Sequence, residues 1–164
     1  PAPSAGATTE DRDYESAQRA FEAGRFAEAR RSFEHVAGAG GPRAASAALM
    51  AARCARHTHG CSVATALLDE LVARHPGTSV GYEATWQAAE CRRSLGQTEL
   101  ARRDYLLLAA EPAYAERVEV ALATMESAQG GPTAVHTAKA KPAAAAPPPA
   151  PEAGNATSAA TTSR

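Results

Sequence analysis

Apolar residues recur at spacings of three and four through residues 10–127, a pattern typical of amphipathic α-helices. Residues 79–110 show it most clearly, with one apolar stripe on each side of Gly96. The first stripe contains Tyr82, Trp86, Ala89 and Arg93, and the second contains Leu100, Ala101, Tyr105 and Leu108. Two such helices cannot cover their stripes alone, so we expect neighbours of the same shape.

The two preceding parts of the chain repeat this pattern. Five series of equivalent positions keep the same two spacings, 35 and then 37 residues. The series are Ala17–Ala52–Ala89, Tyr14–Leu49–Trp86, Ala29–Ala64–Ala101, Phe33–Leu68–Tyr105 and Val36–Leu71–Leu108. Five concurrent series indicate a repeat protein built from three helical hairpins.

A further helix is predicted from Pro112 to about Ser127, after the third hairpin. Val118, Leu122 and Met125 share one of its faces, and Glu116, Arg117 and Glu119 form a polar far side. We interpret it as a terminal helix that covers the last open face of the stack. Residues 1–9 are predicted to be flexible, residues 10–127 to form the domain, and the Ala/Pro-rich residues 128–164 to be a disordered tail.

These patterns resemble a named family. Small–large–small positions over two helices, a Gly or polar turn, a closing proline at Pro76 and Pro112, and a repeat of about 34 residues resemble the tetratricopeptide repeat (TPR). The resemblance spans roughly Asp11 to Met125, and residues 75–108 are similar to repeats of bacterial envelope proteins, including Tol-Pal-associated ones. It implies an all-α, TPR-like right-handed solenoid of three hairpins plus a capping helix.

The resemblance also implies a binding surface, because the first helix of each pair lines the concave side in this family. The residues that it places there are Tyr14, Gln18, Phe21, Leu49, Arg53, Arg56, Trp86, Glu90 and Arg93. Aromatic groups beside arginines are typical of protein-binding hot spots. We expect this face to hold an acidic and apolar segment of another protein; ordinary interhelix packing of Tyr14, Leu49 and Trp86 is the alternative.

The cysteines leave three interpretations open. Cys54, His57, His59 and Cys61 lie within eight residues, and thiolates and imidazoles are ligands that zinc prefers, so a metal- or redox-responsive module is one. A Cys54–Cys61 disulfide across a turn is the second. Since Cys54 and Cys91 occupy equivalent packed slots 37 residues apart, three reduced, structural cysteines are the interpretation that we favour.

Composition excludes several functions. A net charge of −1 argues against nucleic-acid binding, and no apolar run approaches the roughly 18 to 20 residues that span a bilayer, so we expect no membrane insertion by this segment. There is no Gly-rich phosphate loop, nucleophile motif or acidic pair, which predicts a non-enzymatic protein without a cofactor or metal.

The expected function is therefore protein–protein interaction, in a periplasmic or otherwise extracytoplasmic part of a bacterial envelope protein. A cytoplasmic location is the alternative. A regulatory domain of a signalling or anti-sigma-type membrane protein is a further alternative function. Because the chain begins at Pro1 without Met, we expect a processed or excised segment.

Overall fold

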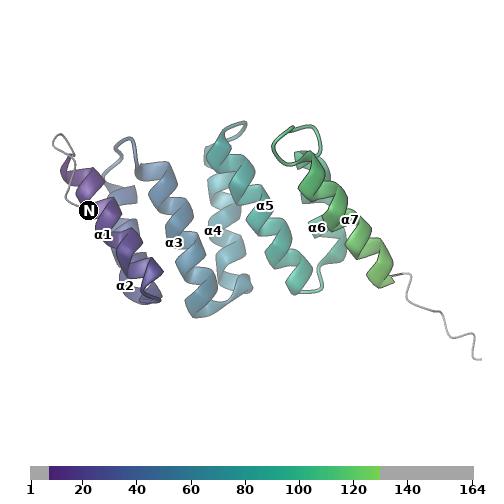
Figure 1. Cartoon of the computed structure of the whole chain (residues 1–164), viewed down its shortest axis with the longest axis horizontal. Helices are drawn as coiled ribbons and strands as arrows, with labels where there is room; N and C mark the ends of the chain where they lie inside the picture. The colour runs from purple at the N-terminus through teal and green to yellow at the C-terminus, as the bar shows by residue number, and fades with distance from the viewer. Residues whose placement is uncertain (1–7, 130–164) are drawn as a thin grey trace, which may run out of the picture. The chain divides into compact units, whose positions relative to one another are not determined.

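Seven α-helices and no strand make up residues 8–129, the part of the chain that the computed structural model describes (Figure 1). They are α1 (Thr9–Glu22), α2 (Phe26–Gly38), α3 (Ala44–His59), α4 (Cys61–Arg74), α5 (Ser79–Ser94), α6 (Thr98–Leu108) and α7 (Ala115–Gln129). The all-helical prediction is confirmed. The segment predicted to be a tail lies almost wholly outside the described residues, and so do residues 1–7.

The helices pair in chain order. Each packs against the next one along the chain, and α3 also contacts α5. Within residues 8–129, α1, α3, α5 and α7 lie in one layer, and α2, α4 and α6 lie behind them in a second (Figure 1). This is the predicted arrangement of three hairpins followed by one terminal helix.

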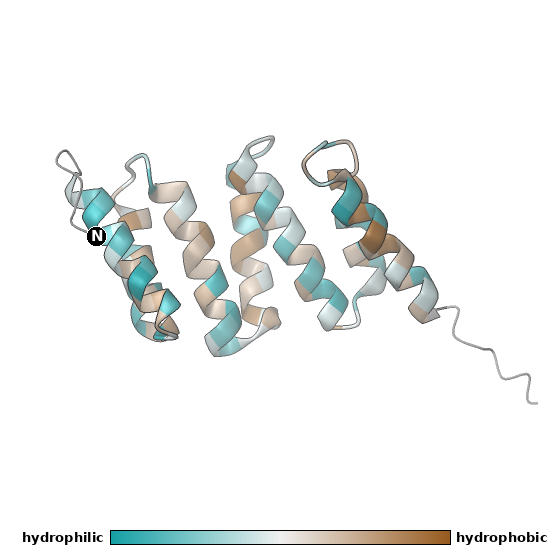
Figure 2. Cartoon of the chain, in the orientation of Figure 1, coloured by the Kyte–Doolittle hydropathy of each residue, from teal (hydrophilic) through white to brown (hydrophobic). Residues whose placement is uncertain are grey.

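The repeated small residues lie in the core. Ala29, Ala64 and Ala101 are each 0 % exposed, as expected for a slot that faces the packed interior in all three hairpins. The large residues four positions later, Phe33, Leu68 and Tyr105, are among the most deeply buried side chains described. The hydropathy of the helices differs along the chain, with mostly hydrophilic residues in α1 and strongly hydrophobic residues in the middle of α7 (Figure 2).

Glycines end the first helix of each hairpin. Gly24, Gly60 and Gly96 lie in the three turns with φ of 73°, 81° and 73°, a left-handed conformation that side chains disfavour. At the second turn, the polar residues 57–60 suggest from sequence that the preceding helix ends near Arg56, and this is wrong. The helix continues to His59, where the N–H of Gly60 still donates to the carbonyl of Arg56 (3.1 Å) and the hydroxyl of Thr58 donates to the carbonyl of Cys54 (3.1 Å), and only Gly60 reverses the chain.

Two helices begin two or three residues after a proline, and the second of them, α7, therefore begins later than the predicted start at Pro112. After Pro42, the N–H of Ala44 donates to the carbonyl of Gly41 (3.0 Å), and α3 begins there. After Pro112, the N–H of Tyr114 donates to the carbonyl of Glu111 (2.9 Å) before α7 starts at Ala115. In both places a turn precedes the helix, so the proline introduces the turn instead of the first helical position.

Candidate functional site

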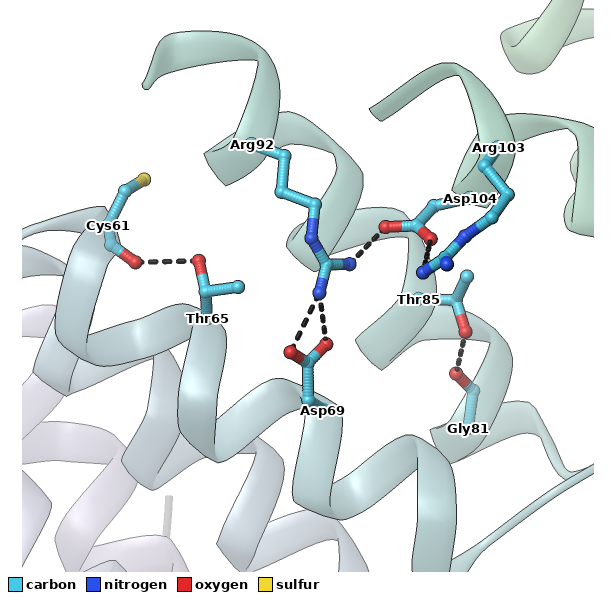
Figure 3. A network of polar contacts seen from close by, with 8 residues as sticks. All are labelled: Cys61, Thr65, Asp69, Gly81, Thr85, Arg92, Arg103 and Asp104. Carbon is cyan, nitrogen blue, oxygen red and sulfur yellow. Dashed lines mark hydrogen bonds and ion pairs between the residues drawn. The ribbon is translucent and has the colours of Figure 1, made fainter. Parts of the chain in front are cut away.

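One buried arginine fixes α5 between the helices on either side of it (Figure 3). Nη2 of Arg92 donates to both carboxylate oxygens of Asp69 on α4, each at 2.7 Å, and Nη1 donates to Asp104 on α6. The Arg92 side chain is 10 % exposed and that of Asp104 is 4 % exposed. A planar guanidinium with two carboxylates in this geometry sets the register of three helices at once.

Elsewhere on α5, Glu83 joins this helix to α3 and to the segment that precedes α7. It accepts hydrogen bonds from Arg53 on α3 (2.7 Å), from Gln87 (2.9 Å) and from the hydroxyl of Tyr114, which precedes α7 (3.0 Å). Burial acts to raise the pKa of Glu83, but these donors and the charge of Arg53 outweigh it and hold the pKa below its ordinary value. Burial and the bond to Glu83 raise the pKa of Tyr114 to about 12.

Glu90, nearly two turns further along α5, is held in the same way. It accepts from the hydroxyl of Tyr105 on α6 and from Arg93 at 2.9 Å. Burial again opposes the shift, yet these donors keep the pKa of the Glu90 carboxyl below its ordinary value. Both glutamates are therefore charged near neutral pH, and both already have partners inside the fold.

Trp86 lies between these two glutamates and packs in a cluster of rings. Its ring centroid is 5.2 Å from that of Tyr105 and 6.3 Å from that of Tyr114. The guanidinium carbon of Arg117, on α7, lies 4.1 Å from the centroid of the Trp86 ring. This distance is typical of a cation–π contact, so α7 adds a cation to the exposed side of the tryptophan.

Two adjoining pockets open around Trp86. We call the first the Trp86 groove; it has a volume of about 510 Å³ and lies between α5 and α7. It is lined by Trp86, Glu90, Arg93, Glu116, Arg117, Val120, Ala121 and Thr124. The second, here the Arg56 pocket, has a volume of about 280 Å³ and is lined by Phe21, Arg53, Arg56, His57, Glu83, Trp86, Gln87 and Glu90. Because Trp86 and Glu90 line both, the two pockets adjoin along α5.

We call the exposed surface of α1, α3, α5 and α7 the first-helix face. Six of the nine residues predicted to bind a partner line the two pockets on it: Phe21, Arg53, Arg56, Trp86, Glu90 and Arg93. Gln18 is exposed on α1 outside both pockets, and Tyr14 is half-buried, with its ring edge-on to Phe33 at 5.3 Å. Leu49 is only 8 % exposed and belongs to the core, as the packing alternative predicted for it.

The contribution of α7 to the site was not predicted. Arg117 was expected on the polar far side of a capping helix, but it faces Trp86 across the groove. A signal was present, because four of the five pocket residues of α5, all except Arg93, have a counterpart 34 residues later on α7 that also lines a pocket. The pairs are Glu83–Arg117, Trp86–Val120, Gln87–Ala121 and Glu90–Thr124. The terminal helix thus continues the register of the first helices as well as capping the stack.

The cysteines pair differently from the prediction. Cys61, at the start of α4, is bonded to Cys91 on α5, with Cα atoms 5.0 Å apart, and Cys54 is a free, buried thiol. The Cys54–Cys61 disulfide and the three reduced cysteines are both wrong. Cys54 and Cys61 lie on successive helices, but α3 continues beyond the expected turn, and Cys61 points instead to the first helix of the next hairpin. The bond therefore joins two neighbouring repeats.

The proposed metal site is not supported by the structure, because within residues 8–129 no three His, Cys, Asp or Glu side chains lie close enough together to hold an ion. Burial raises the pKa of the Cys54 thiol to about 11, which makes it a poor ligand and nucleophile at neutral pH. His57 stacks on Phe26 instead, with centroids 4.1 Å apart and planes 6° from parallel.

None of the helices described has the length and apolar character needed to cross a membrane.

Comparisons with known proteins bear on the fold alone. No family model matches the sequence, and no curated protein matches it. The structure is similar to that of SycD, a type III secretion translocator chaperone of Yersinia enterocolitica, with a TM-score of 0.63 and 17 % sequence identity. The likeness covers 78 % of this chain and 99 % of SycD. The fold is therefore a TPR-like helical repeat; the narrower likeness to Tol-Pal-associated repeats stays a prediction.

Proposed function

We propose that this chain is a non-enzymatic protein-interaction module that holds a segment of another protein on its first-helix face. The observation that carries the proposal is the adjoining pair of pockets around Trp86, to which α1, α3, α5 and α7 all contribute side chains. Exposed aromatic and arginine groups in a concave site are typical of binding hot spots. The structural likeness to SycD, a translocator chaperone, supports the same class of function.

The rigidity of the face also supports this function. Arg92, Glu83 and Glu90 each bond to groups on helices other than α5, so the α5 side chains that line the pockets are held in place before any partner arrives. A site ordered in advance loses less entropy on binding.

Site-specific photo-crosslinking tests this proposal. A photo-reactive amino acid is placed at Thr124, which is exposed in the Trp86 groove, or at Gln18 on α1, with exposed Ala66 on α4 as the control in the other layer. In cells that naturally make the protein, we expect the same crosslinked protein from Thr124 and Gln18, and none from Ala66. Crosslinks from Ala66 alone, or equal yields at all three positions, would contradict the proposal.

We also propose an extracytoplasmic location, and the Cys61–Cys91 bond supports it because disulfides persist mainly in oxidising compartments. Alkylation of the protein in intact cells, followed by denaturation, should then detect one free thiol of the three cysteines. Three free thiols in the native location would indicate a reducing compartment and contradict this part of the proposal.

A further inference from the structure

The charges around Trp86 divide into two groups. Two of the arginines already form ion pairs within the fold: Arg53 pairs with Glu83 (2.7 Å) and Arg93 pairs with Glu90 (2.9 Å). Arg56 and Arg117 are different: among residues 8–129, no carboxylate lies within ion-pair distance of either guanidinium. Both are exposed and line the pockets, Arg56 on the α3 side of Trp86 and Arg117 on the α7 side.

The carboxylates of the two pockets do not cancel these cations. Glu83 and Glu90 each accept at least two hydrogen bonds from the fold, as described above. The third, Glu116, is exposed at the edge of the Trp86 groove. Four arginines therefore line the two pockets with three glutamates, and the two arginines that have no carboxylate within ion-pair distance among residues 8–129 remain to attract an anion.

The Trp86 groove also has apolar lining. Val120 is 63 % exposed there, and Ala121 and the half-buried Trp86 contribute further apolar surface. A volume of about 510 Å³ lies within the range of ligand-binding pockets. The guanidinium carbon of Arg117 is 4.1 Å from the centroid of the Trp86 ring, and a guanidinium in contact with a ring still has N–H groups that can donate to a carboxylate.

We infer that the Trp86 groove takes one apolar side chain of a partner segment, and that carboxylates flanking that side chain pair with Arg56 and Arg117. The inference rests on the proposed function and specifies its partner: an Asp- or Glu-rich segment with a Leu or Phe among the acids. Arg56 and Arg117 replace Arg53 and Arg93 as the residues that recognise its charge, because the latter two already have internal partners.

The chain contains one tryptophan, so the fluorescence of Trp86 reports directly on this groove. The probes are four short capped peptides of equal length: Asp/Glu residues around a Leu-Phe pair, the same pair among Asn/Gln, the same pair among Lys, and the acidic peptide with Ser-Ser in place of Leu-Phe. The acidic Leu-Phe peptide should give a saturable change, with a Kd about tenfold or more below that of each other peptide. Equal affinity for the acidic and the Asn/Gln peptides, or no saturable response to the acidic one, overturns the inference.

Substitutions test whether Arg56 and Arg117 recognise the acidic residues of the peptide. Arg56→Gln and Arg117→Gln should each weaken binding of the acidic peptide about three- to tenfold and leave binding of the Asn/Gln peptide unchanged, since a surface ion pair contributes modestly. Arg31→Gln, at an exposed position on α2, is the matched control and should change nothing. Glu116→Gln should strengthen binding of the acidic peptide, because it removes a like charge from the Trp86 groove. Unchanged affinity in both R56Q and R117Q would overturn the assignment.

The outcome is separable from that of the crosslinking experiment. Crosslinks from Thr124 and Gln18 without any preference for acidic peptides would leave the proposed function standing and refute only this partner chemistry. If the acidic peptide is preferred but Thr124 and Gln18 on the first-helix face give no crosslinks, the result would support the proposed peptide specificity of the Trp86 groove and refute the proposed function in cells.

Discussion

Arg92 on α5 and Asp104 on α6 form an ion pair in which neither side chain is more than 10 % exposed. The pair is joined by Asp69 on α4, whose carboxylate is 49 % exposed. A buried charge is costly once its partner is removed, whereas a half-exposed one can return to water. The two acids that share Arg92 should therefore differ sharply when each is mutated.

Arg92→Leu should destabilise the domain by about 3 to 5 kcal/mol, because it leaves the buried Asp104 with only the longer contact to the exposed Arg103 (3.5 Å). The double variant Arg92→Leu/Asp104→Leu should recover much of that loss. Asp69→Asn is the control and should cost about 1 kcal/mol or less. Urea unfolding of the four proteins measures these differences, and an Arg92→Leu cost no larger than that of Asp69→Asn would show that the network does not fix α5.

The second prediction concerns the bond between repeats. Cys61 and Cys91 are 30 positions apart, so their disulfide restricts a long loop of the unfolded chain, and Cys61→Ser should lower the free energy of unfolding by about 2 to 4 kcal/mol. Reductant should destabilise the wild type by a similar amount and leave Cys61→Ser unaffected. Cys61 is the better position for this test because Cys91 is buried and its replacement would also disturb the core. A reductant effect of equal size in both proteins would mean that this bond is absent.

Close helix packing gives the third prediction. Ala101 is 0 % exposed against the partner helix, so Ala101→Leu should cost about 1 to 3 kcal/mol through overpacking. Ala27→Leu, at an exposed position of α2, should change stability by less than about 0.5 kcal/mol. Thermal or urea unfolding compares the two, and similar costs would be incompatible with the register described.

The fourth prediction concerns acid. The folded-state pKa values of Glu83 and Glu90 lie below their ordinary value of 4.5, so the folded protein binds fewer protons than the unfolded chain in this range. The stability that these carboxylates contribute is present above pH 4.5 and is lost as the pH falls through the folded pKa values. In Glu83→Gln/Glu90→Gln, stability should change less between neutral and acid pH than in the wild type. Stability curves of the same shape for both proteins would contradict the account of these two sites.

The repeat could be predicted from the sequence because the residues that pack between helices recur at regular spacings along the chain. The small slot at Ala29, Ala64 and Ala101 follows from helix contact, and the structure buries all three completely. Helix ends were less predictable: α3 continues past Arg56 because a hydrogen bond from Thr58 and the left-handed Gly60 decide its end, and neither has a periodic signature.

The site was predictable only where it shares that period. Trp86 and Glu90 were identified because the resemblance assigns first helices to one face, and α7 was missed because the sequence after Pro112 was read only as a cap. The Cys61–Cys91 pairing depends on where α4 meets α5 in space, and the spacing of cysteines in the chain does not encode this. The partners of Glu83 come from three parts of the chain and could not be identified from any one of them.

The most direct test of the central claim is the affinity of the protein that the crosslinking experiment identifies, measured by calorimetry with purified components. Trp86→Ala/Arg56→Glu should weaken binding at least about tenfold, or about 1.4 kcal/mol, while the helical circular-dichroism signal is retained. Val120→Asp, a change at a 63 % exposed position of the Trp86 groove, should weaken it as well without disturbing the core. Arg31→Glu, at an exposed position of α2, should leave the affinity unchanged. Full affinity in both first-helix-face variants, with loss in Arg31→Glu, would contradict the account and place the partner on the opposite layer.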